Sequence, residues 1–82
     1  GKELEINFAT SAAGSLWAEL QQPDGTPIPG FTKDECDEII GDQVDRIVTW
    51  NGAADVSALS GAPVRLRFVM KDADLFAIRF RP

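Results

Sequence analysis

Apolar and polar positions alternate most strictly in the C-terminal part of the chain. Two alternating runs, at 64–71 and 75–81, are separated by Asp72-Ala73-Asp74. A period of two places successive side chains on opposite faces of a strand, and aspartates are frequent in turns. The pattern therefore predicts a β-hairpin over 64–82 with its turn at 72–74. Its apolar positions are Val64, Leu66, Phe68, Met70, Phe76, Ile78 and Phe80.

Three earlier stretches show the same period, at 3–8, 15–21 and 44–50. Small residues at 11–14 separate the first two stretches, which predicts two strands that are joined by a tight turn and pair antiparallel. The third stretch carries Arg46 among its apolar positions. A β-bulge or a strand start near this residue would resolve the conflict.

The segments between these strands are rich in turn signals. Turns are predicted at 23–25, which reads Pro-Asp-Gly, and at 51–52, which reads Asn-Gly. The stretch 27–30 contains two prolines, so we expect a loop or a sheet edge there. The stretch 32–40 begins with a capping-box pattern and predicts one or two helical turns. A further short helical turn is predicted at 55–59.

These elements define an all-β fold. About five to six strands, one short helical insertion and no βαβ spacing predict a small antiparallel β-sandwich, jelly-roll-like, or a half-open barrel. The 82 residues predict a single domain, 1–82. Gly1 stands where an initiator Met would stand, and we therefore expect a processed or trimmed end.

Composition narrows the function classes. The net charge of −5 argues against nucleic acid and against an anionic membrane surface, because both require a basic footprint. No apolar run approaches the ~20 residues that a membrane span needs. The chain has no His, and its one cysteine, Cys36, therefore lacks the partner of a typical nucleophile. Asp72 and Asp74 are a carboxylate pair by proximity only, and turn chemistry explains them. We expect no catalytic residue, no enzyme activity and no cofactor.

Two sets of charged residues have competing interpretations. The first set is acidic and consists of Asp34, Glu35, Asp37, Glu38, Asp42 and Asp45. It suits either a site for a hard cation or a solvated loop, and we expect the solvated loop and no metal. The second set suits cross-strand ion pairs or an anion site, and ion pairs are favoured if the chain ends are neighbours in one sheet. It consists of Glu3, Glu5 and Glu19 with Arg65, Arg67, Arg79 and Arg81.

Trp17 is the one candidate ligand-binding residue. Alternation places it on the polar face, opposite to Leu16 and Ala18. Exposed aromatic rings on flat sheets stack on sugar rings or on other proteins. The alternative is that the loop at 27–31 or a neighbouring domain covers the indole. We expect Trp50, at the end of an apolar set, to be structural.

Turns and core positions together resemble a known pattern. The carrying segments are Ile6-Asn7-Phe8-Ala9-Thr10-Ser11-Ala12-Ala13-Gly14-Ser15, Asp24-Gly25-Thr26-Pro27-Ile28-Pro29-Gly30-Phe31, Gly41-Asp42, Val48-Thr49-Trp50-Asn51-Gly52, Leu59-Ser60-Gly61-Ala62-Pro63-Val64-Arg65-Leu66-Arg67-Phe68 and Lys71-Asp72-Ala73-Asp74-Leu75-Phe76. They resemble the C-terminal β-sandwich region of large bacterial proteins related to glycoside hydrolases of the five-bladed-propeller kind. The resemblance covers nearly the whole chain.

The resemblance implies a non-catalytic accessory module of a larger, secreted or periplasmic protein. Its partner would be a catalytic domain of the same polypeptide, with weak polysaccharide contact through Trp17. The alternative is a free-standing small protein that self-associates through its sheet edges into a homo-oligomer, because a core of this size leaves strand edges exposed.

Overall fold

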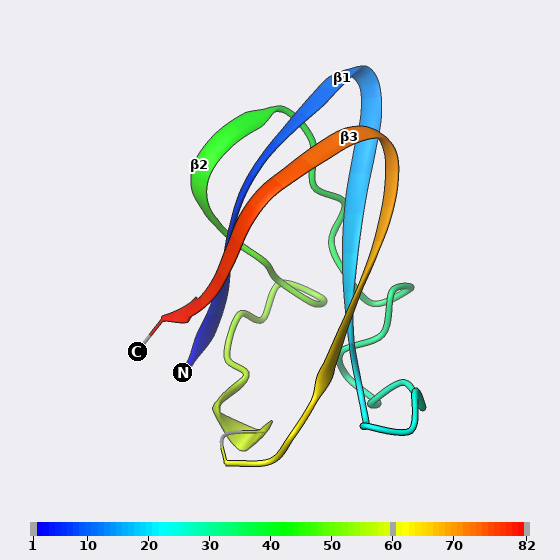
Figure 1. Cartoon of the computed structure of the whole chain (residues 1–82), viewed down its shortest axis with the longest axis vertical. Coiled ribbons are helices and arrows are strands. Elements are labelled where there is room, and N and C mark those ends of the chain that lie inside the picture. The colour runs from blue at the N-terminus through cyan, green and yellow to red at the C-terminus, as the bar shows by residue number, and fades with distance from the viewer. Residues whose placement is uncertain (1, 60, 82) are drawn as a thin grey trace.

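The structure is a computed structural model that describes residues 2–59 and 61–81, apart from the side chains of 42–45. Three strands form one antiparallel sheet in the order β2-β1-β3 (Figure 1). Their bounds are β1 Glu3–Gln21, β2 Asp42–Ile47 and β3 Arg65–Arg81, and a short 3-10 helix, η1, spans Ser57–Leu59. The prediction of an antiparallel all-β fold is confirmed. The five to six strands of the predicted sandwich are replaced by three, two of them very long.

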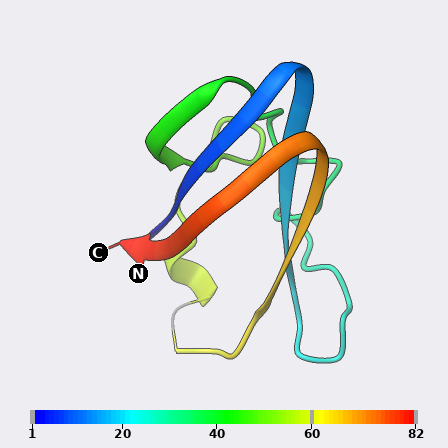
Figure 2. The ribbon, with the colours of Figure 1, turned by 45° about the horizontal axis from the view of Figure 1, so that its top comes forward.

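The two long strands pair with each other along their whole length. The register runs from Glu3 opposite Arg81 to Gln21 opposite Arg65. Both strands bend sharply at the same level, so the sheet folds over on itself (Figures 1 and 2). The first and last described residues therefore lie side by side, and the Lys2 backbone N–H donates a 2.8 Å hydrogen bond to the carbonyl oxygen of Arg81.

Both predicted hairpins are wrong. The segments 11–14 and 72–74 lie inside continuous strands and lie opposite each other at the bend. Between the pairs Thr10–Ala73 and Ser15–Lys71 the register shifts, so that four residues of β1 oppose one residue of β3. Small residues on one strand and Asp72, at a φ of 50°, on the other absorb the bend. The same residue types that favour a chain reversal thus form a bulge, because each half of β1 pairs with β3 and not with the other half.

The strand predicted at 44–50 is present as β2, which begins earlier and ends at Ile47. Of the two alternatives at Arg46, a bulge and a strand start, the structure has the bulge. Ile6 lies opposite Arg46, whereas Phe8 lies opposite Gln43, so β2 has one more residue than β1 in this interval. Beyond the strand, Val48 and Trp50 continue into the core and are almost fully buried. The predicted structural role of Trp50 is confirmed.

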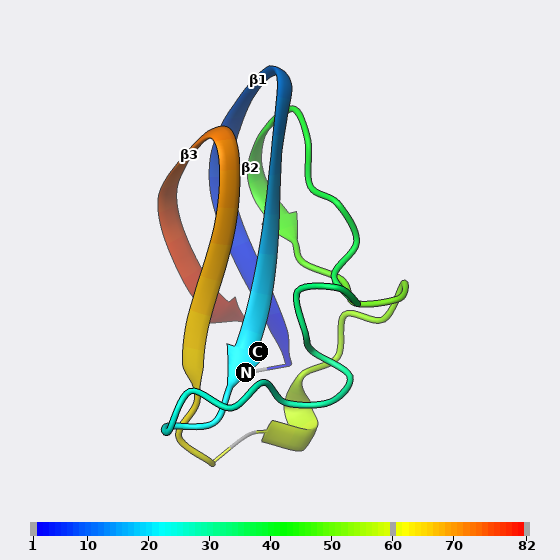
Figure 3. The ribbon, with the colours of Figure 1, turned by 90° about the vertical axis from the view of Figure 1, so that its right-hand side faces the viewer.

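Irregular segments at 22–41, 48–59 and 61–64 form a partial second layer. They bind the edge of β1 that β3 leaves free: the Leu20 N–H donates to the Phe31 carbonyl at 2.9 Å, and Leu16 and Ile39 exchange two backbone bonds. The two predicted turns are confirmed, with Gly25 at a φ of 93° and the Asn51-Gly52 pair at 52° and 79°. Figure 3 shows these segments on one side of β1 and β3 on the other.

The helix predicted at 32–40 is absent. Its capping contacts exist, since the Thr32 hydroxyl and the Glu35 carboxylate lie 2.8 Å apart and Cys36 N–H donates to the Thr32 carbonyl at 3.0 Å. The chain leaves the helical path after this one turn, because the Asp37 N–H donates to the carbonyl of Thr49 instead. The helical turn predicted at 55–59 is confirmed as η1.

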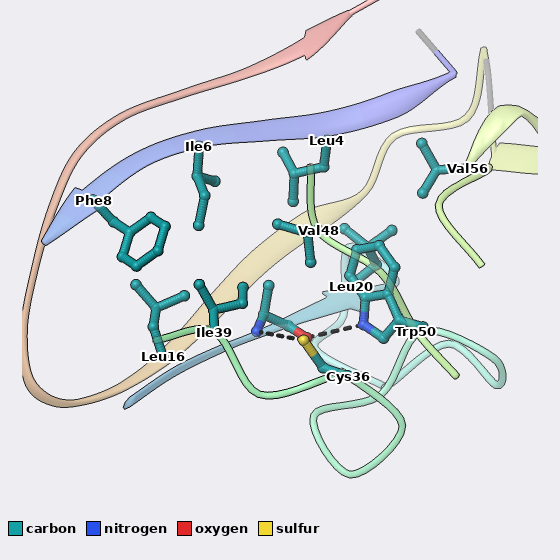
Figure 4. Close-up of a cluster of buried hydrophobic side chains, with 11 residues drawn as sticks. Leu4, Ile6, Phe8, Leu16, Leu20, Cys36, Ile39, Val48, Trp50 and Val56 are labelled. Carbon is teal, nitrogen blue, oxygen red and sulfur yellow. Dashed lines mark hydrogen bonds between the residues drawn. The ribbon is translucent and has the colours of Figure 1, made fainter. Parts of the chain in front are cut away.

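The core lies between the two halves of β1 and the irregular layer (Figure 4). On either side of the bend, every second residue of β1 points into it, as the alternation predicts. Trp50 fixes the layer to the sheet, since its Nε1–H donates a 3.0 Å hydrogen bond to the carbonyl of Ala18, and Phe31 packs edge-on against its ring. The buried apolar residues are Leu4, Ile6, Phe8, Leu16, Ala18, Leu20, Cys36, Ile39, Val48, Trp50 and Val56.

Candidate docking surface on β3

The register places apolar residues of β3 on the same side of the sheet as the core residues of β1. Phe80 lies opposite Leu4, Ile78 opposite Ile6, and Met70 opposite Leu16. The β1 members of these pairs are buried, whereas the β3 members are 40–47% exposed. The core face of the sheet thus continues into solvent at its β3 side.

A fourth apolar residue, Phe76, belongs to the same region. Ala77 pairs with Asn7 and Leu75 with Phe8, so Phe76 is an extra residue in a bulge of β3. A bulge releases a side chain from the regular pairing of the sheet, and the Phe76 ring is 65% exposed. We call Met70, Phe76, Ile78 and Phe80 the β3 apolar patch.

The patch is exposed because the second layer ends before it. The irregular segments bind the far edge of β1, and β3 has a hydrogen-bonded neighbour on one side only among the described strands. Leu66, Phe68 and Leu75 still contact the core. In the part of the chain that the structure describes, the side chains of the β3 apolar patch stay 40–65% exposed.

An apolar hollow lies at the open end of the folded sheet. Its volume is about 170 Å³, below the ~300–1,000 Å³ typical of small-molecule sites. Both ends of β3 contribute to it, through Val64 just before the strand and Phe80 near its end. The hollow therefore has room for one or two side chains. It is lined by Leu20, Val56, Leu59, Gly61, Ala62, Val64 and Phe80.

The other face of β1 and β3 carries the predicted cross-strand ion pairs. Glu5 is 4% exposed, and its carboxylate accepts from Arg79 Nε at 2.9 Å and from Arg81 at 3.2 Å. Arg81 also lies 3.5 Å from Glu3. The ion-pair prediction is confirmed at this end of the sheet. It places acidic residues on β1 and basic residues on β3.

A second pair lies at the other end of the sheet. Glu19 is 4% exposed, and Arg67 lies 3.4 Å from its carboxylate. Hydrogen bonds from the side chain of Gln21 and the backbone N–H of Lys33, with the guanidinium of Arg67, hold the pKa of Glu19 below its ordinary value. No ion pair of Arg65 occurs among the described contacts, so this part of the prediction is not confirmed.

Trp17 lies on the polar face, as predicted, and is half-buried. The Lys33 ammonium lies 4.7 Å from the centre of its ring. A sugar stacking on that side of the ring would have to displace Lys33 and its cation–π contact. Glycan binding at Trp17 stays a prediction.

The acidic residues of the second layer are used by the fold. Glu35 accepts from the backbone N–H of Gly30 at 3.0 Å, and Asp37 accepts from the hydroxyl of Thr49 at 2.6 Å. These bonds lower the pKa of both carboxyl groups, led by the side-chain bonds from Thr32 and from Thr49. Within the described residues, no group of three His, Cys, Asp or Glu side chains is arranged to hold a metal ion. The side chains of Asp42 and Asp45 lie outside this description.

The remaining candidates are structural in position. Cys36 is buried, its Sγ accepts from the Ala18 N–H at 3.3 Å, and burial raises the pKa of its thiol. Asp72 and Asp74 are exposed and lie at the bend of β3. Cys36 thus has the environment of a small apolar residue.

The exposure of the patch does not follow from the alternating pattern. All four of its residues belong to alternating runs that predict a buried face. One signal was available: the long segments 22–41 and 51–63 contain no alternating run that could cover β3 with another strand.

Comparisons with known proteins find no relative. No family model matches the chain, and neither the curated proteins nor the solved structures contain a similar one. The resemblance to glycoside-hydrolase-related proteins therefore stays a prediction. Within the described residues, no helix is long and apolar enough to cross a membrane.

Proposed function

We propose that this chain is a non-catalytic β module that docks onto another protein through the β3 apolar patch. One observation carries the proposal: four large apolar side chains of an edge strand are 40–65% exposed, and three of them, Met70, Ile78 and Phe80, continue the core face of the sheet. Exposed apolar patches of this kind mark interaction sites. A long edge strand also attracts further chains unless its edge is protected.

The polar residues support a scaffolding role. Both buried carboxylates, Glu5 and Glu19, are held by arginines of the neighbouring strand. The turn aspartates Asp24 and Asp55 each accept a backbone N–H two residues further along the chain. Such bonds fix turns and strand register. The hydrogen bonds and ion pairs of these four carboxylates therefore serve the fold.

The partner in this proposal is a larger protein body, such as the catalytic domain that the sequence resemblance implies. An element of the partner would lie over β3 and supply the missing part of the second layer. The docked module would then have the two layers of the sandwich that the sequence predicts. The alternative partner is a second copy of the chain.

A site-specific photocrosslinker tests the proposal in the cells that produce the protein. It replaces Phe76 in one variant and Ala12, an exposed residue at the bend, in a control variant. We expect a discrete adduct from position 76 only. The crosslinked protein is identified by mass spectrometry and purified, and its binding to the wild-type chain and to the variant Ile78→Thr is then measured. We expect it to bind the wild-type chain and not the variant.

Each outcome decides between interpretations. Circular dichroism must show that Ile78→Thr is folded, and a 44% exposed side chain makes this the expected result. A crosslink to the chain itself, with dimers in light scattering, would support self-association. No adduct at position 76, or equal adducts from both positions, would refute docking through the patch.

A further inference from the structure

The free edge of β3 presents two different chemistries on its two faces. The core face carries the apolar patch, and the opposite face carries basic residues. Five of the eight Lys and Arg residues of the chain lie in β3, against two aspartates. The chain as a whole has a net charge of −5, so this strand is a basic stripe on an acidic protein. The basic residues are Arg65, Arg67, Lys71, Arg79 and Arg81.

The pairing of β3 with β1 shows which sequence complements such a strand. β1 presents Leu4 and Ile6 on the core face and Glu3 and Glu5 on the other, where arginines of β3 bind the carboxylates. A strand on the free edge of β3 would meet the same two rows of side chains from the other side. Apolar residues alternating with acidic ones are therefore its best match.

The arginines retain capacity for a second acidic neighbour. Arg79 and Arg67 have side chains that are 69% and 55% exposed although each binds a glutamate. A guanidinium has five N–H donors, and the described bond of Arg79 to Glu5 uses its Nε only. Carboxylates on both sides of one arginine can thus be bound together.

Charge disfavours a second copy of β3 as the occupant. In a two-fold antiparallel pairing centred on Ala73, Arg65 would lie opposite Arg81 and Arg67 opposite Arg79. Like charges directly opposite each other destabilise a strand pair. The edge is therefore better suited to a different strand than to itself.

We infer that β3 binds an extended segment of its partner by strand addition, and that this segment alternates apolar with acidic residues. The sheet then has the order β2-β1-β3-partner. Backbone hydrogen bonds supply the affinity, and the two side-chain rows supply the specificity. The inference rests on the proposed docking function and defines its mode.

Three labelled nine-residue peptides test the inference on the whole chain. The first copies residues 2–10, Lys-Glu-Leu-Glu-Ile-Asn-Phe-Ala-Thr. The second carries Lys in place of Glu3 and Glu5, and the third has the composition of the first with its apolar residues made contiguous. Affinity is measured by fluorescence anisotropy, and hydrogen exchange locates the protected amides.

We expect the first peptide to bind with protection confined to β3, and the other two to bind about tenfold more weakly or not at all. Raising the salt concentration should weaken the first peptide's binding. Arg65→Glu, which breaks no described ion pair, should weaken it several-fold. Lys33→Glu, a charge reversal outside β3 whose described ion pair is a 3.9 Å contact with the exposed Asp34, should not. Loss of protection in β2 would show that the peptide replaces β1, which would overturn strand addition at the free edge.

The outcomes separate this inference from the proposed function. Equal binding of the first two peptides would overturn the acidic requirement, and equal binding of the contiguous peptide would overturn strand addition. If no peptide binds while position 76 crosslinks to a partner, docking stands and the strand-addition mode falls. If position 76 gives no adduct and no peptide binds, both fall.

Discussion

Gly14 is the residue on which the bend of the sheet depends most directly. It is buried and lies in the bend of β1, at residues 11–14. A methyl group at its Cα would lie 2.4 Å from the carbonyl oxygen of Asp72, 2.8 Å from that of Lys71 and 3.0 Å from the backbone nitrogen of Ser11. All three atoms belong to the backbone, so no side-chain rotation can relieve the contact. Gly14→Ala must therefore separate the two strands at the bend.

The size of the effect follows from two opposing contributions. Overpacking of a tight site costs about 1–3 kcal/mol, and rigid backbone neighbours place this case at the upper end. Replacing Gly by Ala restricts the unfolded chain and returns about 0.4–1 kcal/mol. We expect a net loss of about 2 kcal/mol in the free energy of unfolding. For a domain of this size that lowers the Tm by roughly 8–16 °C.

Urea unfolding followed by tryptophan fluorescence measures this loss, because Trp50 is almost fully buried. Gly41→Ala is a matched control: no atom lies within 4 Å of its added methyl, and its φ of 96° makes backbone strain the only cost. That strain costs about 1–2 kcal/mol. Ser11→Ala, at an exposed position of the same bend, should change stability by less than about 0.5 kcal/mol. A Gly14→Ala variant as stable as the wild type would refute the close approach of the strands.

Three further predictions concern single side chains. The pKa of Glu19 is lowered, so its stabilising contribution is present above the ordinary glutamate pKa of about 4.3 and is lost as the pH falls through the lower folded value. Glu19→Gln should therefore lower the free energy of unfolding at neutral pH, and the variant should lose less stability than the wild type as the pH falls. Equal urea midpoints for the two proteins between about pH 3 and 7 would contradict this. Burial raises the pKa of Cys36, so Ellman's reagent should label it only as urea unfolds the chain, and rapid labelling of the native protein would contradict this. If Trp17 stacks on glycans, a polysaccharide should change the tryptophan fluorescence saturably. The change should be lost in Trp17→Ala and enhanced in Lys33→Ala, because the latter uncovers the ring. No response to a panel of polysaccharides would refute binding.

Local patterns predict the parts of the fold that local geometry determines. The inward-facing positions of β1, the turn at 51–52 and the bulge near Arg46 follow from alternation and from residues with special backbone freedom. The ion pairs of Glu5 and Glu19 follow from the expected pairing of the N-terminal and C-terminal strands in one sheet. Each depends on one strand or on one pair of strands.

The errors arise where distant pairing decides between two local solutions. Small residues at 11–14 suit a reversal as well as a bulge, and only the register with β3 selects the bulge. The capping contacts of Thr32 and Glu35 form, yet the helix does not, because backbone groups distant in sequence accept the N–H groups that follow. The exposure of Phe76 depends on how far the second layer extends. Periodicity carries no information on that extent.

The pairing of the first strand with the last has a consequence for how the chain folds during synthesis. Glu3 pairs with Arg81 and Gln21 with Arg65, so β1 cannot pair with its main neighbour until β3 has been synthesised. At about 5–20 residues per second, that delay is roughly 3–12 s on the ribosome. Throughout it, Leu4, Ile6 and Phe8 lack the strand that will shield them. Contacts this distant in sequence also slow folding itself, which makes the nascent N-terminal strand the segment most in need of a chaperone.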